Sequence, residues 1–395
     1  MNEPLSRPVV LVAHSGAELY GADRVLLESV TGMVARGLRV VVTLPSGGAL
    51  VAELERAGAT VVIVRVPVLR KSFLSVAGLF TLARESMSGA WRGARLIRRI
   101  GPDLLYVNTV TIPLWPVLGR LAGRRVLVHV HEAERTARKA LRVALAAPLL
   151  CATTIVANSR YSADTLAQTL PRLRARTTVI YNGVPGPAQP VPPRSAVESP
   201  LRVLYVGRLS SRKGVHTAIA AVASARDAGL DVQLDLVGAV FPGYEWYADQ
   251  LHEQVEQLGL DGSVTFHGFQ GDVWAFYAAA DVAIVPSGLD EPFGDTAVEA
   301  LLAARPLIVS RTPGLSEAAG GFDSVQFVDV DDAGAVARAL ATAVEQWPLL
   351  REQAVANAAL AAMRYSPERY SDAVCAELER LAPAADRRRQ RTPGR

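Results

Sequence analysis

Cysteine is scarce in this sequence, with two residues among 395. Cys151 and Cys375 lie far apart, so they give no disulfide framework and favour free thiols in a reducing compartment. Long apolar runs are missing too, because proline, threonine and asparagine interrupt every uncharged stretch before the roughly twenty residues that a membrane span needs. The apolar run at residues 8–13 is too short for the core of a signal peptide. We therefore expect a cytoplasmic protein, either soluble or peripheral on the inner face of the membrane.

Charge is also limited, since charged residues make up 20% of the chain and apolar residues 50%, which indicates a globular protein. The net charge is +4, but arginines are concentrated at residues 92–99, 135–142 and 387–389. Such patches favour acidic partners, a membrane surface or polyanionic substrates, unless they are ordinary solvated faces. No motif of stacking aromatic residues accompanies them, so we expect no nucleic-acid partner.

Two series of alternating strands and helices follow one another along the chain. This alternation predicts the α/β class, with doubly wound parallel sheets that bind ligands at the carboxyl ends of their strands. The first series has expected strands at residues 9–13, 39–44, 60–64, 103–108, 125–131, 154–157 and 179–181, and expected helices at 23–36, 49–57 and 135–150. The second has expected strands at 201–206, 232–237, 264–267 and 281–286, and expected helices at 215–228, 247–258 and 334–344.

Two stretches interrupt this pattern. Residues 185–200 are rich in proline, which predicts an extended, poorly packed linker between two domains. Residues 69–99 alternate apolar side chains with arginine and lysine. A stretch of this kind can lie on a membrane, but a pair of helices packed on the first domain is the more common structure, and we expect that here.

The loop at residues 206–214 joins a strand to a helix at the start of the second domain. Gly207 lets the backbone turn close to a ligand, and Arg208 and Lys213 bring two cations into one short loop. Arginine suits bidentate phosphate contacts, whereas lysine acts as a point charge. Alone, such a loop is more often a basic surface cluster than a phosphate site.

A second candidate element lies at residues 289–305. Pro292 disfavours helical geometry at Glu291, which places Glu291 on a loop. Asp295 or Thr296 can then cap a helix, with Glu299 in its first turn. Because helix N-termini attract anions, a phosphate is expected between the two glutamates. The plainer alternative is that Glu299 complements the helix dipole and Glu291 is a solvated loop acid.

Three further features need an interpretation. His131 ends an expected strand beside Glu132, where it could donate or accept a proton, although a lone histidine is more often structural. The glycine loop after the first strand lacks the Gly-x-Gly-x-x-Gly spacing of dinucleotide-binding sites. Asp-Val-Asp-Asp at 329–332 looks like a metal-binding Asp-x-Asp motif, but it precedes a helix, so we expect helix capping and no metal site.

Several motifs resemble those of the family 4 retaining glycosyltransferases. Glu-Pro-Phe-Gly at 291–294 is followed by Glu299-Ala300, which gives the Glu-x7-Glu spacing of that family. Residues 207–214 match Gly-Arg-Leu-x-x-x-Lys-Gly at every fixed position. Gly-Ala-Asp-Arg at 21–24 resembles the family's Gly-Ala-Glu-Arg loop, with aspartate in place of glutamate.

The resemblance implies the GT-B fold, in which two Rossmann-like domains face each other across a cleft. The expected parts are an acceptor domain at 1–184, the linker at 185–200, a nucleotide-sugar domain at 201–366, a helix at 367–385 that crosses back to the first domain, and a disordered basic tail at 386–395. The implied donor is a UDP- or GDP-linked sugar, used without cofactor or metal. The implied acceptor is a glycan or a lipid-linked sugar in cell-envelope or exopolysaccharide assembly.

The resemblance also implies roles for single residues. Glu291 would hold sugar hydroxyls, His131 would lie near the transferred sugar, and Arg208 and Lys213 would stabilise the charge on the leaving diphosphate. The other expected contacts with the donor or the acceptor are Gly207, Gly294, Asp295, Thr296, Glu299 at the ribose, Gly268 at the nucleobase, and Gly21 in the acceptor loop. Two alternatives are an epimerase of the same two-domain shape and a non-catalytic nucleotide-sugar-binding subunit.

Overall fold

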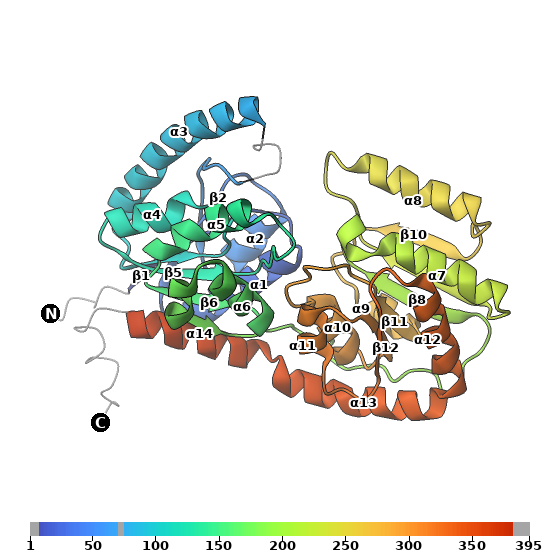
Figure 1. Ribbon diagram of the computed structural model, residues 1–395. Helices are drawn as coiled ribbons and strands as arrows, with labels where there is room; N and C mark the ends of the chain where they lie inside the picture. The colour runs from blue at the N-terminus through green and yellow to red at the C-terminus, as the bar shows by residue number, and fades with distance from the viewer. Residues whose placement is uncertain (1–7, 70–74, 382–395) are drawn as a thin grey trace, which may run out of the picture. The chain divides into compact units, whose positions relative to one another are not determined.

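The computed structural model describes residues 8–69 and 75–381. The expected basic tail and residues 70–74 of the amphipathic stretch lie outside the described residues. The chain divides into two compact units (Figure 1). Unit 1 comprises Met1–Gly183 and Pro367–Arg395, and unit 2 comprises Val184–Ser366. Each unit is built on one parallel β-sheet, so the prediction of two Rossmann-like domains is confirmed.

The sheet of unit 1 has the order β3-β2-β1-β4-β5-β6-β7. Strand β1 lies inside the sheet and is buried on both faces, so its side chains alternate between two cores. Val10 and Val12 pack into one core, whereas Leu11 and Ala13 pack into the other. The strands are β1 (Val9–Ala13), β2 (Arg39–Leu44), β3 (Thr60–Ile63), β4 (Leu104–Val107), β5 (Arg125–Val130), β6 (Thr154–Ala157) and β7 (Thr177–Val179).

Seven α-helices of unit 1 are described, and the last comes from the C-terminal end of the chain. This helix packs against α1, and Tyr370 Oη forms a 2.6 Å hydrogen bond with Ser29 Oγ. Gly32 permits the close approach, since a Cβ there would lie 1.7 Å from Ser371 Oγ. The helices are α1 (Gly21–Ala35), α2 (Ala49–Arg56), α3 (Val76–Ile100), α4 (Leu114–Leu121), α5 (Lys139–Ala146), α6 (Arg160–Thr169) and α14 (Pro367–Leu381).

Where the structure describes it, the amphipathic stretch forms one long helix rather than the expected pair. Helix α3 begins after Ser75, whose side chain accepts a hydrogen bond from Gly78 N, and continues without interruption to Gly101. Gly89 and Gly93, in the middle of the helix, do not break it, because both face the domain. A Cβ on Gly89 would lie 2.8 Å from Pro67, and one on Gly93 would lie 2.7 Å from Leu118. These positions therefore allow close packing and are not turns.

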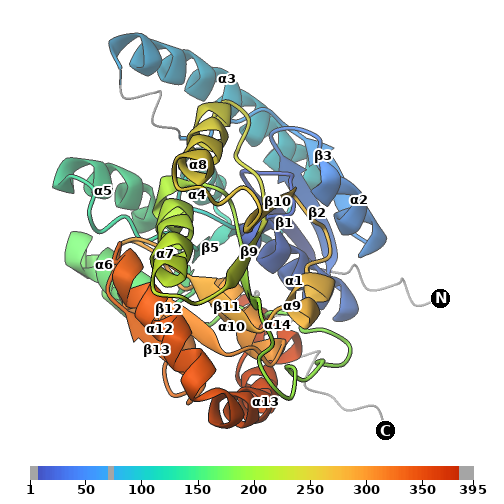
Figure 2. The ribbon, with the colours of Figure 1, turned by 90° about the vertical axis from the view of Figure 1, so that its right-hand side faces the viewer.

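Unit 2 has a six-stranded sheet of order β10-β9-β8-β11-β12-β13. Helices α7 and α12 lie side by side against it (Figure 2). The strands are β8 (Leu201–Val206), β9 (Val232–Val237), β10 (Val264–Gly268), β11 (Val282–Val285), β12 (Leu307–Ser310) and β13 (Val325–Val328). The helices are α7 (Val215–Asp227), α8 (Glu245–Gln257), α9 (Trp274–Ala279), α10 (Asp295–Leu302), α11 (Pro313–Ala319), α12 (Ala333–Glu345) and α13 (Trp347–Arg364).

The proline-rich segment has no helix or strand and most of its residues are exposed, as expected, but its part around residues 191–194 is bound to the rest of unit 2. Its backbone carbonyls at residues 191, 193 and 194 accept hydrogen bonds from Arg305, Arg351 and Trp347. Arg194 itself forms an ion pair with the fully buried carboxylate of Asp281. Pro193 lacks an N–H donor but keeps its carbonyl, which accepts from Arg351.

Smaller differences concern element ends. The expected helix at 135–150 shortens to α5 and a 3-10 turn at Ala147–Cys151. The last strand of unit 1 lies at Thr177–Val179, two residues before its expected position. Both cysteines are free thiols, as predicted. Within the described ranges, no helix combines the length and apolar character needed to cross a membrane.

Candidate functional site

The sequence order of strands reverses between β8 and β11 in unit 2, which are neighbours in the sheet. Such a switch point is where open α/β sheets bind ligands, beyond the carboxyl ends of the strands. The loop at 207–214 follows β8, and the loop at 286–294 follows β11. The two motifs singled out in the sequence of unit 2 therefore meet at one place.

These two loops are joined by one backbone hydrogen bond and one hydrogen bond from a side chain. Gly288 N donates a 2.7 Å hydrogen bond to Arg212 O, and Arg212 donates to Asp290 O at 2.9 Å. Gly214 has a left-handed conformation, with φ of 68°, and a Cβ there would lie 1.9 Å from Pro286 O. Only glycine fits both conditions. Gly207 also has positive φ, at 150°, directly after β8.

Lys213 and Glu291 form an ion pair across the two loops, with Nζ and Oε2 at 2.6 Å. The Glu291 side chain is 8% exposed and that of Lys213 is 30% exposed. Burial alone would raise the pKa of Glu291, but the adjacent Lys213 ammonium overcomes this and holds the pKa below its ordinary value. Glu291 is therefore a buried, charged carboxylate, and the interpretation of it as a solvated loop acid is wrong.

Arg208 lies on the same loop as Lys213 and is held by an aromatic ring. Its guanidinium carbon is 3.3 Å from the centre of the Phe241 ring. Tyr205 Oη supports the loop by donating a 2.9 Å hydrogen bond to Arg208 O. A guanidinium stacked on a ring has fewer rotamers and keeps its N–H groups at the ring edge, where they can donate to an anion.

Helix α10 begins differently from the prediction. Its N-cap is Gly294, with φ of 105°, rather than Asp295 or Thr296, and no side chain caps the helix. Asp295 is the acid of the first turn, and Glu299 lies a turn further on. A glycine cap leaves the first backbone amides without an intrahelical side-chain acceptor, which keeps them suitable for an anion. Glu299 Oε2 accepts a 3.4 Å hydrogen bond from Tyr277 Oη.

Two other predicted features of unit 2 lie away from this ion pair. Gly268 is the last residue of β10, has φ of 66° and accepts a hydrogen bond from Gly238 N at 2.8 Å. Asp332 is the N-cap of α12, and its side chain accepts a 2.7 Å hydrogen bond from Ala335 N. The capping interpretation of the Asp-x-Asp sequence is confirmed. Of the residues that the structure describes, no three or more His, Cys, Asp or Glu are grouped to hold a metal ion.

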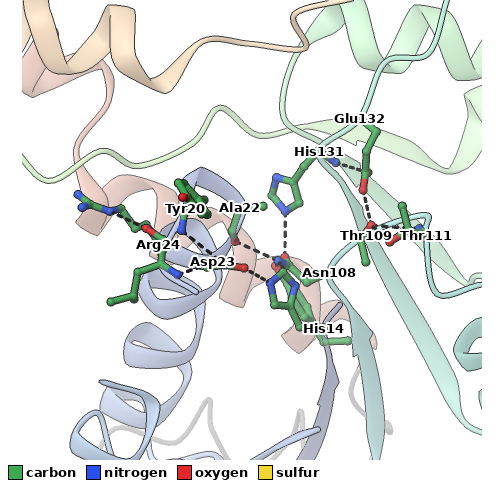
Figure 3. Close-up of polar contacts among 12 residues, drawn as sticks. His14, Tyr20, Ala22, Asp23, Arg24, Asn108, Thr109, Thr111, His131 and Glu132 are labelled. Carbon is green, nitrogen blue, oxygen red and sulfur yellow. Dashed lines mark hydrogen bonds and ion pairs between the residues drawn. The ribbon is translucent and has the colours of Figure 1, made fainter. Parts of the chain in front are cut away.

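Unit 1 has its own switch point, between β1 and β4, and polar side chains lie there in a chain (Figure 3). His14 follows β1, and its Nε2 is 2.6 Å from Asp23 Oδ1 of α1. Asn108 follows β4, and its Nδ2 is 3.2 Å from His14 Nδ1. Asn108 Oδ1 is in turn 2.9 Å from Nε2 of His131, which follows β5.

The hydrogen-bond pattern assigns the ring protons. Asp23 accepts from His14 Nε2, so His14 Nδ1 is the acceptor for the Asn108 amide. Asn108 Oδ1 accepts from His131 Nε2, which leaves His131 Nδ1 as an acceptor. That atom is shielded from solvent and has no hydrogen-bond partner within residues 8–69 and 75–381. Burial, with His129 and His14 nearby, holds the pKa of His131 well below its usual value, so the ring is neutral.

Glu132 lies beside this chain and is bound by groups from the neighbouring loop. Thr109 Oγ1 donates to its Oε1, while the amides of His131 and Val110 donate to Oε2 at 3.0 and 3.4 Å. Burial raises the pKa of the Glu132 carboxyl, although these hydrogen bonds oppose the shift. Glu132 also lines a small pocket with Val110, Val130, Arg142 and Thr165.

The sequence interpretation therefore missed part of the candidate site. His14, Asp23 and Asn108 were not among its expected site residues, and Gly21 is the exposed first residue of α1. The available signal was position: each missed residue follows a strand, or begins a helix, at the reversal of strand order. The structure brings Lys213 and Glu291 together within unit 2, and it places His131 in unit 1.

Comparisons with known proteins cover most of the chain. The family model "Glycosyl transferases group 1" matches residues 192–360, and the model "Glycosyltransferase Family 4" matches residues 19–185. A glycogen synthase of Mycobacterium tuberculosis is 36% identical over 146 residues, which are 36% of this chain and 34% of that protein. The matched segment thus spans about a third of that relative.

A longer match is with a 2-deoxystreptamine N-acetyl-D-glucosaminyltransferase of Streptomyces fradiae, which is 28% identical over 324 residues, 74% of each chain. Among solved structures, that of Anabaena Alr3699/HepE in complex with UDP-glucose superposes with a TM-score of 0.79 at 22% identity. The superposition covers 94% of this chain and 99% of that one, and at this identity it shows the fold.

Proposed function

Because the chain belongs to glycosyltransferase family 4, we propose that it is a retaining enzyme that transfers a sugar from a nucleoside diphosphate sugar to an acceptor hydroxyl. The observation that carries this proposal is the pairing of Lys213 with the buried Glu291 at the switch point of unit 2, beside Arg208. Cations and a carboxylate in one place suit a ligand that joins a diphosphate to sugar hydroxyls.

We assign the donor site to unit 2. Arg208, Lys213 and the first amides of α10 hold the diphosphate, and they stabilise the negative charge that grows on it as the bond to the sugar breaks. Glu291 accepts hydrogen bonds from the sugar hydroxyls, and Glu299 accepts them from the ribose. A Glu291 carboxylate that stays ionised is the better acceptor for hydroxyl donors.

We assign the acceptor site to unit 1. The neutral His131 positions the acceptor, while Asn108, His14 and Asp23 fix the ring through the chain of hydrogen bonds. In the transfer, the bond from the anomeric carbon to the phosphate oxygen breaks and a bond to the acceptor oxygen forms. The proton of the acceptor hydroxyl passes to the leaving phosphate, and the configuration at the anomeric carbon is kept.

The donor is expected to be UDP-linked or GDP-linked, and UDP is the first to test because the HepE structure contains UDP-glucose. Cell-envelope or exopolysaccharide assembly is the proposed setting, with a glycan or lipid-linked acceptor. We assign charge stabilisation to the two cations and the helix terminus, so we expect nucleotide binding to be unaffected by EDTA.

The test is a thermal-shift titration with UDP, GDP, ADP and dTDP in EDTA. A ligand at a hundred times its dissociation constant stabilises the folded state by about 2.7 kcal/mol, which is easily detected. One nucleotide should raise the melting temperature of the wild type and of Arg338→Ala, an exposed arginine of the same unit, but not of Arg208→Ala. A shift that is equal in Arg208→Ala would contradict the assigned site.

Turnover separates the enzyme from a non-catalytic binding subunit. Incubation with the matching nucleotide sugar and a glycan acceptor should release the nucleoside diphosphate. His131→Ala should leave the thermal shift unchanged and lower kcat by roughly a hundredfold, because the acceptor hydroxyl loses its positioning contact. Nucleotide binding without release for any donor would favour the binding subunit.

A further inference from the structure

Helix α3 presents large apolar side chains to solvent. Phe80, Met87 and Trp91 are 77%, 72% and 65% exposed. Their spacings of seven and four residues place them on one face of the helix. The opposite face is the one that packs on unit 1, with Leu96 and Ile97 in its core. The exposed apolar residues are therefore additional to those that attach α3 to the domain.

Arginines lie on the same exposed face. Arg84 is four residues from Phe80, and Arg95 and Arg98 are four and seven residues from Trp91, so the cations continue the apolar stripe. The Arg95 guanidinium lies 5.7 Å from the centre of the Trp91 ring. The helix holds five arginines and one acid, Glu85, so its net charge is +4.

We propose that this exposed face of α3 docks unit 1 on an anionic lipid surface. Figure 1 shows α3 as a long helix along the outside of unit 1. The side chains would enter the boundary between headgroups and acyl chains, while the guanidinium groups contact lipid phosphates. The face is defined by Phe80, Arg84, Met87, Trp91, Arg95 and Arg98.

Charge favours an anionic lipid surface over a second copy of the chain as the partner of this face. A second copy of the chain would set arginine against arginine on a helix that carries a single acid, which opposes self-association through this face. A bilayer with anionic lipids offers uniform negative charge and an apolar layer behind it, so it satisfies both kinds of side chain at once. A straight stripe one helix wide also suits a flat surface.

The test is co-sedimentation of the full chain with vesicles of phosphatidylcholine, alone or mixed with phosphatidylglycerol. The wild type should bind the mixed vesicles more tightly, and high salt should weaken this binding by screening. Phe80→Ser/Met87→Ser/Trp91→Ser should weaken it by about tenfold or more, because its apolar contact is lost. Arg84→Gln/Arg98→Gln should weaken it by roughly 25-fold, at about fivefold per arginine.

Matched controls remove exposed arginines and exposed apolar side chains outside α3. Arg172→Gln/Arg174→Gln takes two exposed arginines from unit 1, and Leu349→Ser/Leu360→Ser/Met363→Ser takes three exposed apolar side chains from α13. Both should bind as the wild type does. All substituted positions are exposed, so circular dichroism melting curves should coincide.

Three results would overturn the proposal: no binding to mixed vesicles, equal binding by the α3 variants and the wild type, or a wild-type dimer that the triple serine variant converts to monomer. Because the vesicle assay contains no sugar donor, its failure would leave the proposed transferase activity untouched.

Discussion

Lys213 and Glu291 are 78 residues apart in the sequence and form one ion pair, so removing either side chain leaves the other without its partner. Lys213→Met leaves a nearly buried carboxylate without its cation and should cost about 2–4 kcal/mol of unfolding free energy. Glu291→Gln keeps an oxygen for the ammonium and should cost less. The double variant should then show a coupling energy of about 1–3 kcal/mol in urea unfolding.

The control is an ion pair of the same unit that is open to solvent. Arg226 and Asp231 approach to 2.8 Å with side chains 39% and 51% exposed. Solvent screening weakens such a pair, so its coupling energy should be clearly smaller than that of Lys213 with Glu291. Equal coupling energies in the two cycles would mean that burial does not strengthen the Lys213–Glu291 pair.

His129 should make the stability of the protein depend on pH. Burial lowers the pKa of His129 to about 3. Its ordinary value in an unfolded chain is about 6.5, so the unfolded chain takes up a proton first as the pH falls. The contribution of neutral His129 to the free energy of unfolding is thus complete above about pH 6.5. It declines as the pH falls from there toward pH 3, by up to about 1.4 kcal/mol per pH unit.

His129→Phe removes the group that takes up this proton in the unfolded chain. The free energy of unfolding, measured with urea, should therefore fall less steeply between about pH 6.5 and pH 4. The variant leaves the Tyr106 hydroxyl without its 2.6 Å partner, so its absolute stability will also change. The slope is therefore the quantity to compare, and above pH 7 the two slopes should agree. An undiminished acid slope in the variant would show that His129 does not carry the effect.

Residue types could be predicted from the sequence more readily than their partners. The Glu-x7-Glu spacing and the Gly-Arg-Leu-x-x-x-Lys-Gly loop pointed to the family, which is confirmed. The ion pair of Lys213 with Glu291 was not predicted, because it requires that β8 and β11 be neighbours in the sheet. For the same reason the contact of His14 with Asn108, across 94 residues, was invisible until β1 and β4 were paired.

At the scale of elements, glycines set how closely the loops of unit 2 approach. Gly214→Ala combines a left-handed conformation with a Cβ 1.9 Å from Pro286 O, so it should cost about 2–4 kcal/mol and weaken nucleotide binding. Gly259 has a similar φ of 64° but open space around its Cβ. Gly259→Ala should therefore cost only about 1–2 kcal/mol and leave binding unchanged. Equal losses in the two variants, measured by urea unfolding, would exclude the contact with Pro286 as the cause.

Helices were predicted better than their ends. The start of α10 was assigned to Asp295 or Thr296 because these side chains cap helices well, but Gly294 at positive φ takes that place. Its Cβ would lie 2.4 Å from Leu315, a contact with α11 that local sequence cannot reveal. Likewise α3 stays whole because Gly89 and Gly93 pack on Pro67 and Leu118, which lie outside the helix.

At the scale of the whole molecule, the chain order and the two units do not coincide. Residues 1–183 lack one wall of their core until α14 packs against α1, and the side chains that α14 supplies include Val374, Cys375 and Leu378. Unit 1 therefore cannot complete its core before the end of the chain has been made, whereas unit 2 is continuous in sequence. The GT-B fold class predicted from the sequence is confirmed by the two sheets and by the solved structures.

This arrangement predicts where a distant substitution acts. Leu378, 1% exposed, belongs to the core of unit 1, so Leu378→Ala should cost about 2–5 kcal/mol there. Hydrogen exchange should show lost protection in β1 and β2, while β8 and β9 keep theirs. Leu340→Ala removes an equally buried leucine from unit 2 and should give the reverse pattern. If both variants lost protection evenly over both units, the two would unfold together, and the C-terminal helix would stabilise the whole chain rather than unit 1.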